Sequence, residues 1–382
     1  MATQSRLRVA FVCDTLHTTA GGGVMSAEYV IERLRRDHDV VSLSADGEDA
    51  LRPLRLPIRA LREMHFVIAV PDRARTLRAL ESADVVHLQL PFWLSFEVLK
   101  EARKLGLPVV AGFHFQPENA LHNVGIHSST LNELLYRFMV KHFYNRVDAV
   151  VCPTPFAEEK LRAHGLTTRS FVISNGVPPD VARATARAAP HVTHGSGDPF
   201  FILAVGRLAA EKRQEVILEA IRLSPHRDRI RLVLCGTGPR EAELKELALA
   251  LPNGAEIGFV SRDELLSDLS RADLFVHASD VELEGMAVLE AMSAGLPALI
   301  ADAPESAASA FALNDDFRFP AGDALALSRK IDALIEDPAK LDAAREPYRA
   351  RAHAYDFDAS VGKLIDVYRW VLEGHEGHRA AE

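Results

Sequence analysis

The stretch that decides the interpretation of this chain is residues 279–297, which read SDVELEGMAVLEAMSAGLP. It follows an apolar run at 272–278 that predicts a buried strand. A helix is expected over 286–294, because Gly295 suits a C-terminal stop and Pro297 bars continuation beyond it. The stretch therefore predicts a strand, a glycine turn and a helix in direct succession.

Gly285 stands where this strand becomes the helix. A glycine there lets the backbone come close to a ligand, and the first helical N–H groups, those of Met286 and Ala287, point out of the turn. Glu282 and Glu290 bracket the turn with seven residues between them. At the carboxyl end of a parallel strand, this arrangement suits a phosphate flanked by sugar hydroxyls. A plain strand–turn–helix with ordinary surface glutamates would have the same spacing.

The composition is typical of a soluble globular protein with room for two domains, since the chain has 382 residues, 48% hydrophobic and 25% charged. The net charge of −9 argues against nucleic acid as the main partner. No apolar signal core and no run of about 18 apolar residues is seen. No zinc motif is present either, so the cysteines are expected to be small buried side chains: Cys13, Cys152 and Cys235.

Strands and helices alternate in both halves of the chain, which predicts an α/β fold with two doubly wound, Rossmann-like domains. Residues 178–199 are rich in Pro, Ala and Gly and lack apolar periodicity, which indicates a linker. The tail after Gly374 is expected to be mobile. The expected parts are a first domain at 1–178, a linker at 179–199, a second domain at 200–355 and a C-terminal segment at 356–382.

Two loops that follow predicted strands carry candidate site residues. Arg207 and Lys212 follow the strand 200–205, where a guanidinium fork and an ammonium could meet a diphosphate. His114 ends the strand 109–113 and is a candidate acid, base or phosphate partner. Surface basic residues and a structural histidine are the plainer interpretations.

Residues 51–80 form a basic stretch in an acidic chain, with seven arginines opposed by Glu63 and Asp72 alone, a local charge of +5. The stretch is either a solvated face or a patch that binds anionic lipid, at about 1 kcal/mol per basic residue. The lipid-binding interpretation predicts a cytoplasmic protein that is peripheral on the inner face of the plasma membrane. The arginines are Arg52, Arg55, Arg59, Arg62, Arg73, Arg75 and Arg78.

The Glu-x7-Glu spacing and the run GRLAAEKR at 206–213 resemble retaining GT-B glycosyltransferases of family 4. The resemblance implies two domains facing a central cleft, with the C-terminal segment crossing back to the first. It implies that Glu282 contacts the donor sugar and Glu290 the ribose, while the basic pair neutralises the diphosphate. Glu284 stands where the family often has an aromatic residue. The expected nucleotide-sugar contacts are Gly22, Gly23, Arg207, Lys212, Gly236, Val260, Gly285, Met286, Ala287 and Glu290.

The segments 91–94 (PFWL) and 112–119 (GFHFQPEN) look similar to bacterial glycosyltransferases that act on diacylglycerol. This implies transfer of a hexose, glucose or a related sugar such as glucuronic acid, from a UDP-linked donor to a membrane lipid with retained configuration. His114 would then orient sugar or acceptor, and Glu282, Arg207 and Lys212 complete the expected catalytic set. No metal or other cofactor is expected, because no Asp-x-Asp stands at a strand end.

Three alternatives share this framework. A family 4 enzyme with a soluble sugar or polyol acceptor needs the same motifs. An NAD-dependent oxidoreductase would use the same kind of sheet, but the fingerprint G-x-G-x-x-G is absent from the glycine run at 21–23. A catalytically inactive sugar-nucleotide-binding module is disfavoured by the presence of both glutamates and both cations.

Overall fold

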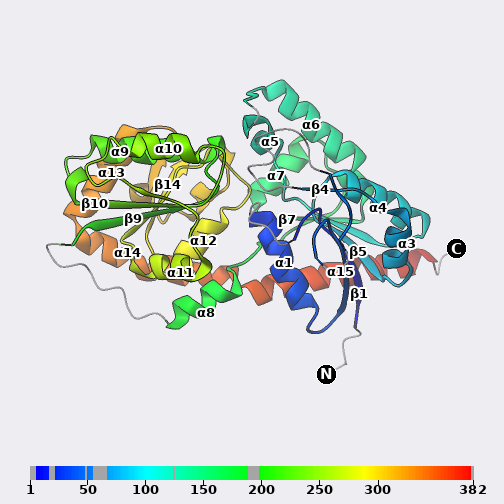
Figure 1. Ribbon diagram of the computed structural model, residues 1–382. Helices are drawn as coiled ribbons and strands as arrows, with labels where there is room; N and C mark the ends of the chain where they lie inside the picture. The colour runs from blue at the N-terminus through cyan, green and yellow to red at the C-terminus, as the bar shows by residue number, and fades with distance from the viewer. Residues whose placement is uncertain are drawn as a thin grey trace. The chain divides into compact units, whose positions relative to one another are not determined.

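The computed structural model describes residues 6–16, 22–47, 50–54, 67–123, 125–187 and 198–379. The chain divides into two compact units, each built on its own sheet (Figure 1). Unit 1 comprises the chain up to Leu121, residues 126–175 and the chain from Phe357 on, and unit 2 comprises residues 122–125 and 176–356. Along the described ranges, no helix is long and apolar enough to cross a membrane.

Unit 1 contains a six-stranded parallel sheet in the order β2-β1-β5-β6-β7-β8. Its central strands are fully buried and mainly apolar, as expected of a parallel sheet with helices on both faces. A short antiparallel pair, β3 with β4, accompanies it. The bounds are β1 (Arg8–Val12), β2 (Asp39–Leu43), β3 (Pro53–Leu54), β4 (Ile68–Ala69), β5 (Val85–Leu88), β6 (Val109–Gly112), β7 (Ala149–Cys152) and β8 (Ser170–Val172).

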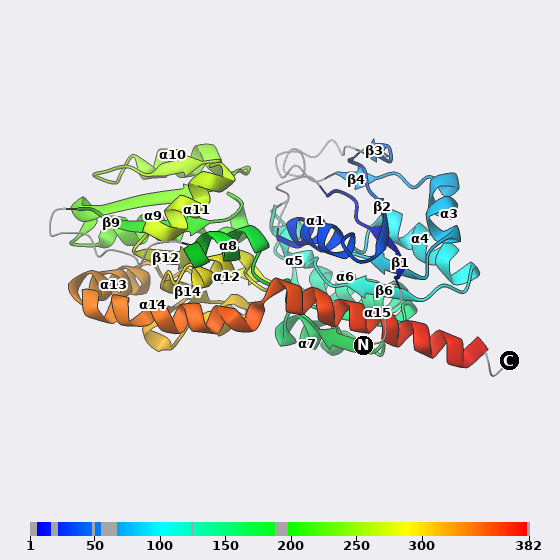
Figure 2. The same cartoon turned by 90° about the horizontal axis from the view of Figure 1, so that it is seen from below.

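The first and last helices of unit 1 pack against each other beside this sheet (Figure 2). The last helix, α15, buries Phe357, Val361, Leu364 and Tyr368 in the same core as β1 and α1. The helices are α1 (Gly22–Leu34), α3 (Arg73–Glu81), α4 (Trp93–Lys104), α5 (Pro117–Asn123), α6 (Ser129–His142), α7 (Pro155–Ala163) and α15 (Phe357–Arg379), with a 3-10 turn η1 (Tyr144–Arg146).

Helices α4 and α15 of unit 1 include parts of segments that the sequence analysis names. Helix α4 begins at Trp93, so half of the segment 91–94 is helical. Helix α15 continues past Gly374 to Arg379. The mobility expected after Gly374 stays a prediction.

Unit 2 also contains a six-stranded parallel sheet, in the order β11-β10-β9-β12-β14-β16. The strand predicted at 200–205 is confirmed residue for residue as β9. A two-stranded parallel pair, β13 with β15, stands apart from the main sheet. The bounds are β9 (Phe200–Val205), β10 (Ile230–Cys235), β11 (Glu256–Gly258), β12 (Leu274–His277), β13 (Val281–Glu282), β14 (Ala298–Asp302), β15 (Glu305–Ser306) and β16 (Arg318–Pro320).

Helices cover both faces of this sheet, with α9, α10 and α13 in one layer and α8, α11, α12 and α14 in the other (Figure 1). The two Rossmann-like parallel sheets with helices that the sequence predicts are confirmed. The helices are α8 (Pro179–Arg187), α9 (Gln214–Leu223), α10 (Glu241–Ala248), α11 (Arg262–Arg271), α12 (Met286–Ser293), α13 (Ala324–Glu336) and α14 (Pro338–Ala352). The 3-10 turns are η2 (Ala210–Lys212), η3 (Arg227–Arg229), η4 (Ala308–Phe311), η5 (Asp315–Phe317) and η6 (His353–Tyr355).

The segment predicted as a linker begins with a helix. Helix α8 spans 179–187, and its Val181 is fully buried in the core of unit 2. One fully buried valine in a helix of nine residues produces no apolar periodicity, so the sequence pattern does not indicate a helix here. Residues 188–197 of the predicted linker lie outside the described residues.

Buried thiols match the sequence prediction. Cys13, Cys152 and Cys235 are buried and unoxidised. Burial raises the pKa of Cys152 and Cys235 to about 12, so both remain protonated and unreactive.

Candidate active site

Three loops at the carboxyl edge of the unit 2 sheet are tied together by backbone hydrogen bonds. The N–H of Gly206 donates to Cys235, that of Leu208 to Thr237, and that of Gly236 to Gly258, at 2.8–3.0 Å. A Cβ added to Gly236 would lie 1.9 Å from the carbonyl oxygen of Gly206. The structure therefore explains Gly236 by close backbone packing, and its contact with a nucleotide stays a prediction.

The first of these loops presents Arg207, whose side chain is fixed by a buried carboxylate. Its Nη2 lies 2.7 Å from Oε1 of Glu211, which is fully buried in the turn η2. The amide of Gln214 donates to the Arg207 carbonyl at 2.7 Å. The sequence analysis missed Glu211, although it stands within the run that carries the resemblance.

Lys212, at the end of η2, pairs with Glu282 on β13. The Nε2 atom of His277, at the end of β12, lies 3.3 Å from Glu282 Oε1. Two residues expected to bind neighbouring parts of one donor are thus in direct contact. The sequence analysis did not identify His277 as a residue of the site. Its position at the carboxyl end of a predicted strand could have indicated it.

The glycine turn before α12 has the backbone that its sequence predicts. Gly285 adopts φ 96°, which strains any residue with a side chain. A Cβ there would also lie 3.1 Å from the Cβ of Ala308. Met286 and Ala287 are the first two residues of α12, and helix-initial N–H groups lack acceptors inside the helix. The N–H groups of Met286 and Ala287 are therefore not bonded within α12.

Glu290 lies one turn into α12 and is buried. It pairs with Arg262, a cation that the sequence analysis missed. Oε1 of Glu290 lies 3.0 Å from Nη2 of Arg262, the first residue of α11. The same guanidinium contacts Asp180 of α8 at 2.6 Å. The capping-box pattern of Ser261 and Glu264 marks the start of α11 and could have placed Arg262 at the carboxyl edge of β11.

The two glutamates of the Glu-x7-Glu pair have opposite electrostatic environments. Burial opposes ionisation of Glu282, but Lys212 and His277 outweigh it and hold the pKa of this carboxyl well below its ordinary value. Burial raises the pKa of Glu290, and Arg262 only partly offsets that effect. Glu282 is therefore held in its ionised form, whereas the ionisation of Glu290 depends on Arg262.

Val260 lies just beyond β11, in the loop before α11. Strand β11 ends two residues earlier, at Gly258, and the contact of Val260 with a nucleotide sugar stays a prediction. Phe259 is exposed and Val260 is half-buried against the core of unit 2. The backbone of this loop is free of the sheet ladder, which a base-binding loop requires.

In unit 1, His114 follows the end of β6 and its ring folds back over the strand. A Cβ added to Gly112 would lie 2.6 Å from the His114 ring, so only glycine allows this orientation. Behind it, buried His87 bonds Gln89 through Nε2 and the Tyr368 hydroxyl through Nδ1, each at 2.9 Å. A cavity of about 40 Å³ adjoins these side chains.

Both histidines are uncharged at neutral pH. Burial lowers the pKa of His87 to about 4, and burial together with His87 lowers the pKa of His114 to about 3. His114 can therefore donate or accept one hydrogen bond as a neutral ring, which fits an orienting role better than that of a general base.

We expect His114→Asn to lower kcat/KM about tenfold or less, because one neutral hydrogen bond contributes about 0.5–1.5 kcal/mol. The shape of the pH–rate profile should not change, because a group with a pKa of about 3 does not titrate in the working range. Measuring kcat/KM across pH for both proteins tests this. A loss of about 100-fold or more, together with a vanished acid limb, would instead make His114 a general base.

The remaining predicted residues are only partly described. Gly22 and Gly23 are the first two residues of α1, and Gly21 lies outside the described residues. Of the basic stretch, Arg52, Arg73 and Arg78 are exposed, whereas the Arg75 guanidinium donates to the Ala50 carbonyl at 2.6 Å. The arginines outside the described residues are Arg55, Arg59 and Arg62.

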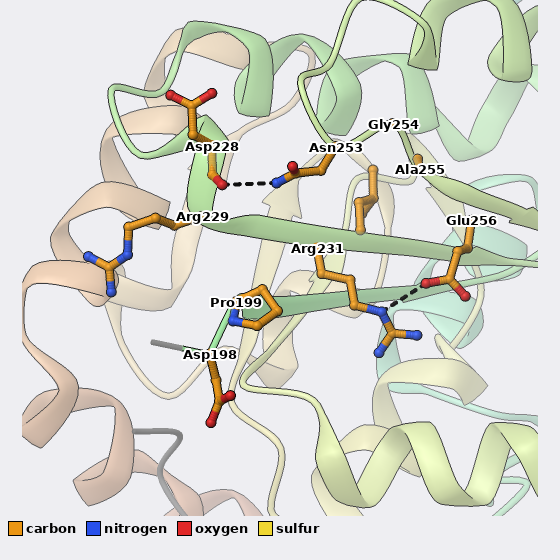
Figure 3. A pocket seen from close by; sticks show the side chains of 10 residues that line it. Asp198, Pro199, Asp228, Arg229, Arg231, Asn253, Gly254, Ala255 and Glu256 are labelled. Carbon is orange, nitrogen blue, oxygen red and sulfur yellow. Dashed lines mark hydrogen bonds and ion pairs between the residues drawn. The ribbon is translucent and has the colours of Figure 1, made fainter. Parts of the chain in front are cut away.

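One pocket of unit 2 lies away from these loops (Figure 3). Its volume is about 530 Å³, and it opens at the amino ends of β9 and β10. Arg231 pairs with Glu256 at 2.8 Å, and the Asn253 amide donates to the Asp228 carbonyl at 3.0 Å. Ligands of such sheets bind at the carboxyl edge, so we assign the pocket no part in the site.

Charged side chains, a glycine turn and a helix start thus meet at one edge of a Rossmann-like sheet, as in enzymes that bind nucleotide diphosphates. Two family models match the chain: Glycosyltransferase Family 4 at residues 20–181 and Glycosyl transferases group 1 at residues 189–352. Together they span most of the sequence. The chain therefore belongs to the family 4 and group 1 glycosyltransferases of GT-B fold.

Two curated proteins illustrate the range of its relatives. The alpha-monoglucosyldiacylglycerol synthase of Streptococcus pneumoniae is 22% identical over 312 residues, which cover 77% of this chain and 70% of that protein. The GDP-mannose-dependent alpha-mannosyltransferase of Mycolicibacterium smegmatis is 28% identical over 315 residues, 78% of this chain and 80% of that protein.

Solved structures show the same fold. Anabaena HepE in complex with UDP and glucose has a TM-score of 0.70 at 18% identity, covering 95% of this chain and 99% of that chain. Sucrose-phosphate synthase from Thermosynechococcus elongatus has a TM-score of 0.69 at 18% identity, covering 97% of this chain and 100% of that chain. At such identities the likeness concerns the fold alone.

Proposed function

We propose that this glycosyltransferase moves a hexose, glucose or a related sugar such as glucuronic acid, from a UDP-linked donor to a membrane lipid such as diacylglycerol. The observation that carries the donor half is the corner where Lys212 meets Glu282 beside the glycine turn of α12. The lipid acceptor is supported by the S. pneumoniae relative, named a monoglucosyldiacylglycerol synthase. We assign the acceptor to unit 1 and the donor to unit 2.

In the proposed reaction, the bond between the anomeric carbon and the phosphate oxygen breaks, and an acceptor hydroxyl oxygen forms a new bond on the same face. The departing diphosphate takes the acceptor proton. Arg207 and Lys212 offset the charge that develops on it. The Lys212 ammonium has three donors, so it can bridge Glu282 and a phosphate oxygen at once. Glu282, firmly anionic, accepts hydrogen bonds from the sugar hydroxyls.

The nucleotide half of the donor would lie along α12 and the loop after β11. The N–H groups of Met286 and Ala287 suit the diphosphate, and the backbone around Val260 suits the base. Glu290 accepts hydrogen bonds from the ribose hydroxyls, which requires its ionised form. Its charge in turn depends on Arg262, the one cation in contact with it among the described residues.

Arg262→Met should make nucleotide affinity depend on pH. Asp180 of α8 and Arg262 of α11 are the charged groups that face Glu290. Without the guanidinium, burial and Asp180 raise the pKa of Glu290 further, so the carboxyl gains a proton as pH falls. UDP affinity should then fall by about tenfold or more as the pH is lowered from alkaline to mildly acidic, since a hydrogen bond to a charged group contributes about 1.5–3 kcal/mol.

Calorimetric titration with UDP across this range measures the effect. Arg231→Met is the matched control, because Arg231 also pairs with a glutamate but lies at the amino edge of the sheet. A loss of affinity that is equal at every pH would mean that Arg262 contacts the nucleotide itself.

The deciding experiment offers the protein radiolabelled UDP-glucose, UDP-glucuronic acid or GDP-mannose with diacylglycerol in detergent micelles. We expect a glucosylated lipid from a UDP-linked sugar. NMR of the product from an α-linked donor should show an α linkage, and dialysis against a chelator should not reduce activity. Transfer from GDP-mannose alone would align the chain with its mannosyltransferase relatives. Transfer to soluble sugars but not to lipid would establish the soluble-acceptor alternative.

The oxidoreductase alternative has no support, because both halves of the chain match glycosyltransferase models. An inactive binding module would bind UDP yet neither transfer nor hydrolyse the donor, which the same assay detects. Action at the inner face of the plasma membrane belongs to the proposal as well. It requires a surface of the protein that meets lipid.

A further inference from the structure

Two helices of unit 1 expose large apolar side chains to water. Leu134 and Phe138, one turn apart on α6, are 57% and 52% exposed, and Trp93 at the start of α4 is 49% exposed. Ile126, shortly before α6, is also exposed. Apolar side chains gathered on one surface mark an interaction site more often than scattered ones.

These side chains belong to one surface because α4 and α6 run alongside each other. The Phe96 ring lies 6.2 Å from that of Phe138 and 5.1 Å from that of Phe143, centre to centre. Further along both helices, Arg103 of α4 donates to the Arg146 carbonyl just after α6, at 2.9 Å. The helices therefore point the same way, and Trp93, one turn before Phe96, lies toward Leu134 and Phe138.

Cations border this apolar surface. Lys141, one turn after Phe138, is exposed, and within the described ranges neither it nor the Arg146 guanidinium contacts a carboxylate. Helix α3, with exposed Arg73 and Arg78, packs against the other side of α4. In a chain of net charge −9, an apolar surface edged by cations is complementary to an anionic bilayer.

Aromatic contacts connect this surface with the acceptor side of the proposed site. Phe115 follows His114 directly, and its ring meets the edge of Phe92 at 4.9 Å. Phe92 in turn precedes Trp93, the most amphipathic of the exposed side chains. Tryptophan is enriched where one end of a side chain is apolar and the other is wet, as at a membrane interface.

We propose that the outer surface of α4 and α6 docks on an anionic lipid bilayer, with Trp93, Leu134 and Phe138 entering the acyl boundary and Lys141, Arg146, Arg73 and Arg78 contacting headgroups. The proposal rests on the lipid acceptor proposed above. Under this proposal α4 and α6 make the main membrane contact, and the basic stretch 51–80 contributes only Arg73 and Arg78 at one edge of it. A protein partner or a second copy of the chain is the alternative occupant.

The chain contains two tryptophans, which makes the test direct. Trp370 on α15 is 46% exposed, close to the value for Trp93, and packs edge-on against Phe171. The Trp370→Phe variant therefore keeps Trp93 as its fluorescent reporter. The Trp93→Phe variant keeps Trp370, which is the matched control. Each protein is mixed with vesicles of phosphatidylcholine and phosphatidylglycerol whose acyl chains carry bromine.

We expect the emission of Trp93 to shift to the blue and to be quenched, while the emission of Trp370 stays unchanged. Vesicles of phosphatidylcholine alone, and high salt, should abolish most of the effect, because headgroup attraction is screened within about 8 Å at physiological salt. Quenching of Trp370 instead, or of neither tryptophan, overturns the proposal. Equal response to neutral and anionic vesicles overturns the role of the cations.

Leu134→Ser with Phe138→Ser should lower vesicle affinity by about 100-fold, since each buried apolar side chain contributes roughly tenfold or more. Leu249→Ser, at a leucine 83% exposed in unit 2, is the control and should bind vesicles normally. Both substitutions lie at the surface, and thermal unfolding verifies that they fold. Normal sedimentation of the double variant with anionic vesicles contradicts the proposal.

Transfer to diacylglycerol in detergent micelles distinguishes the two proposals. The double variant should keep its activity in micelles and lose it on vesicles. If the enzyme glucosylates lipid in micelles while Trp93 is not quenched on vesicles, the docking surface is wrong and the function stands. If no lipid is glucosylated in either system, but Trp93 is quenched, the acceptor assignment is wrong and the docking surface stands.

Discussion

Arg207→Ala should lower turnover by about 100-fold or more. One preorganised donor that stabilises developing charge is commonly worth about 2.7–4 kcal/mol in the transition state. Arg207 qualifies because Glu211 fixes its guanidinium before any substrate binds, with the two atoms 2.7 Å apart. Steady-state kinetics with saturating donor measures the loss in kcat.

The same contact makes a control necessary. Arg207→Ala leaves the fully buried Glu211 without its cation, which could weaken folding and mimic a catalytic loss. In the double variant Arg207→Ala with Glu211→Gln, no buried charge is left uncompensated. It should unfold at nearly the wild-type temperature and stay as slow as the single variant. If this double variant turns over near the normal rate, Arg207 plays no part in the reaction.

Glu282→Ala and Glu290→Ala should fail in different ways. Glu282 is expected to hold the sugar, so its loss should reduce transfer by about 100-fold or more while UDP binding stays normal or tightens, because Lys212 is then released to the diphosphate. Glu290→Ala should mainly weaken UDP binding, because the ribose is bound before and during reaction.

Calorimetry with UDP and kinetics with the full donor separate the two outcomes. Glu282→Gln is the useful companion, because it keeps the shape of the side chain and removes only the charge that Lys212 and His277 maintain. If Glu282→Ala loses as much UDP affinity as Glu290→Ala, the assignment of sugar and ribose to the two glutamates is wrong.

The fold could be predicted from the sequence because its signals are local. Apolar runs of four to six residues mark the buried parallel strands, and β9 has the predicted bounds. The turn at Gly285 could be predicted too, since a positive φ between a strand and a helix requires glycine. Elements that bury few apolar residues, such as α8, could not be predicted, because one buried valine produces no periodicity.

The candidate site could be predicted only as a set of residues, without their partners. The sequence identified Arg207, Lys212, Glu282 and Glu290 by spacing and by family resemblance. It gave no indication that Lys212 pairs with Glu282, 70 residues away, or that Glu290 is held by Arg262, 28 residues before it. Likewise, His87 meets Tyr368 across 281 residues.

The difference has a physical cause. A strand or a helix start depends on a few neighbouring residues, and the chain carries that information wherever the segment lies. The charge of a carboxylate depends on burial and on whichever cation the packing brings within about 4 Å. Here the sequence by itself determined two Rossmann-like sheets and the chemical types at their edges. Only the tertiary structure decided that Glu282 is a firm anion while Glu290 depends on Arg262 for its charge.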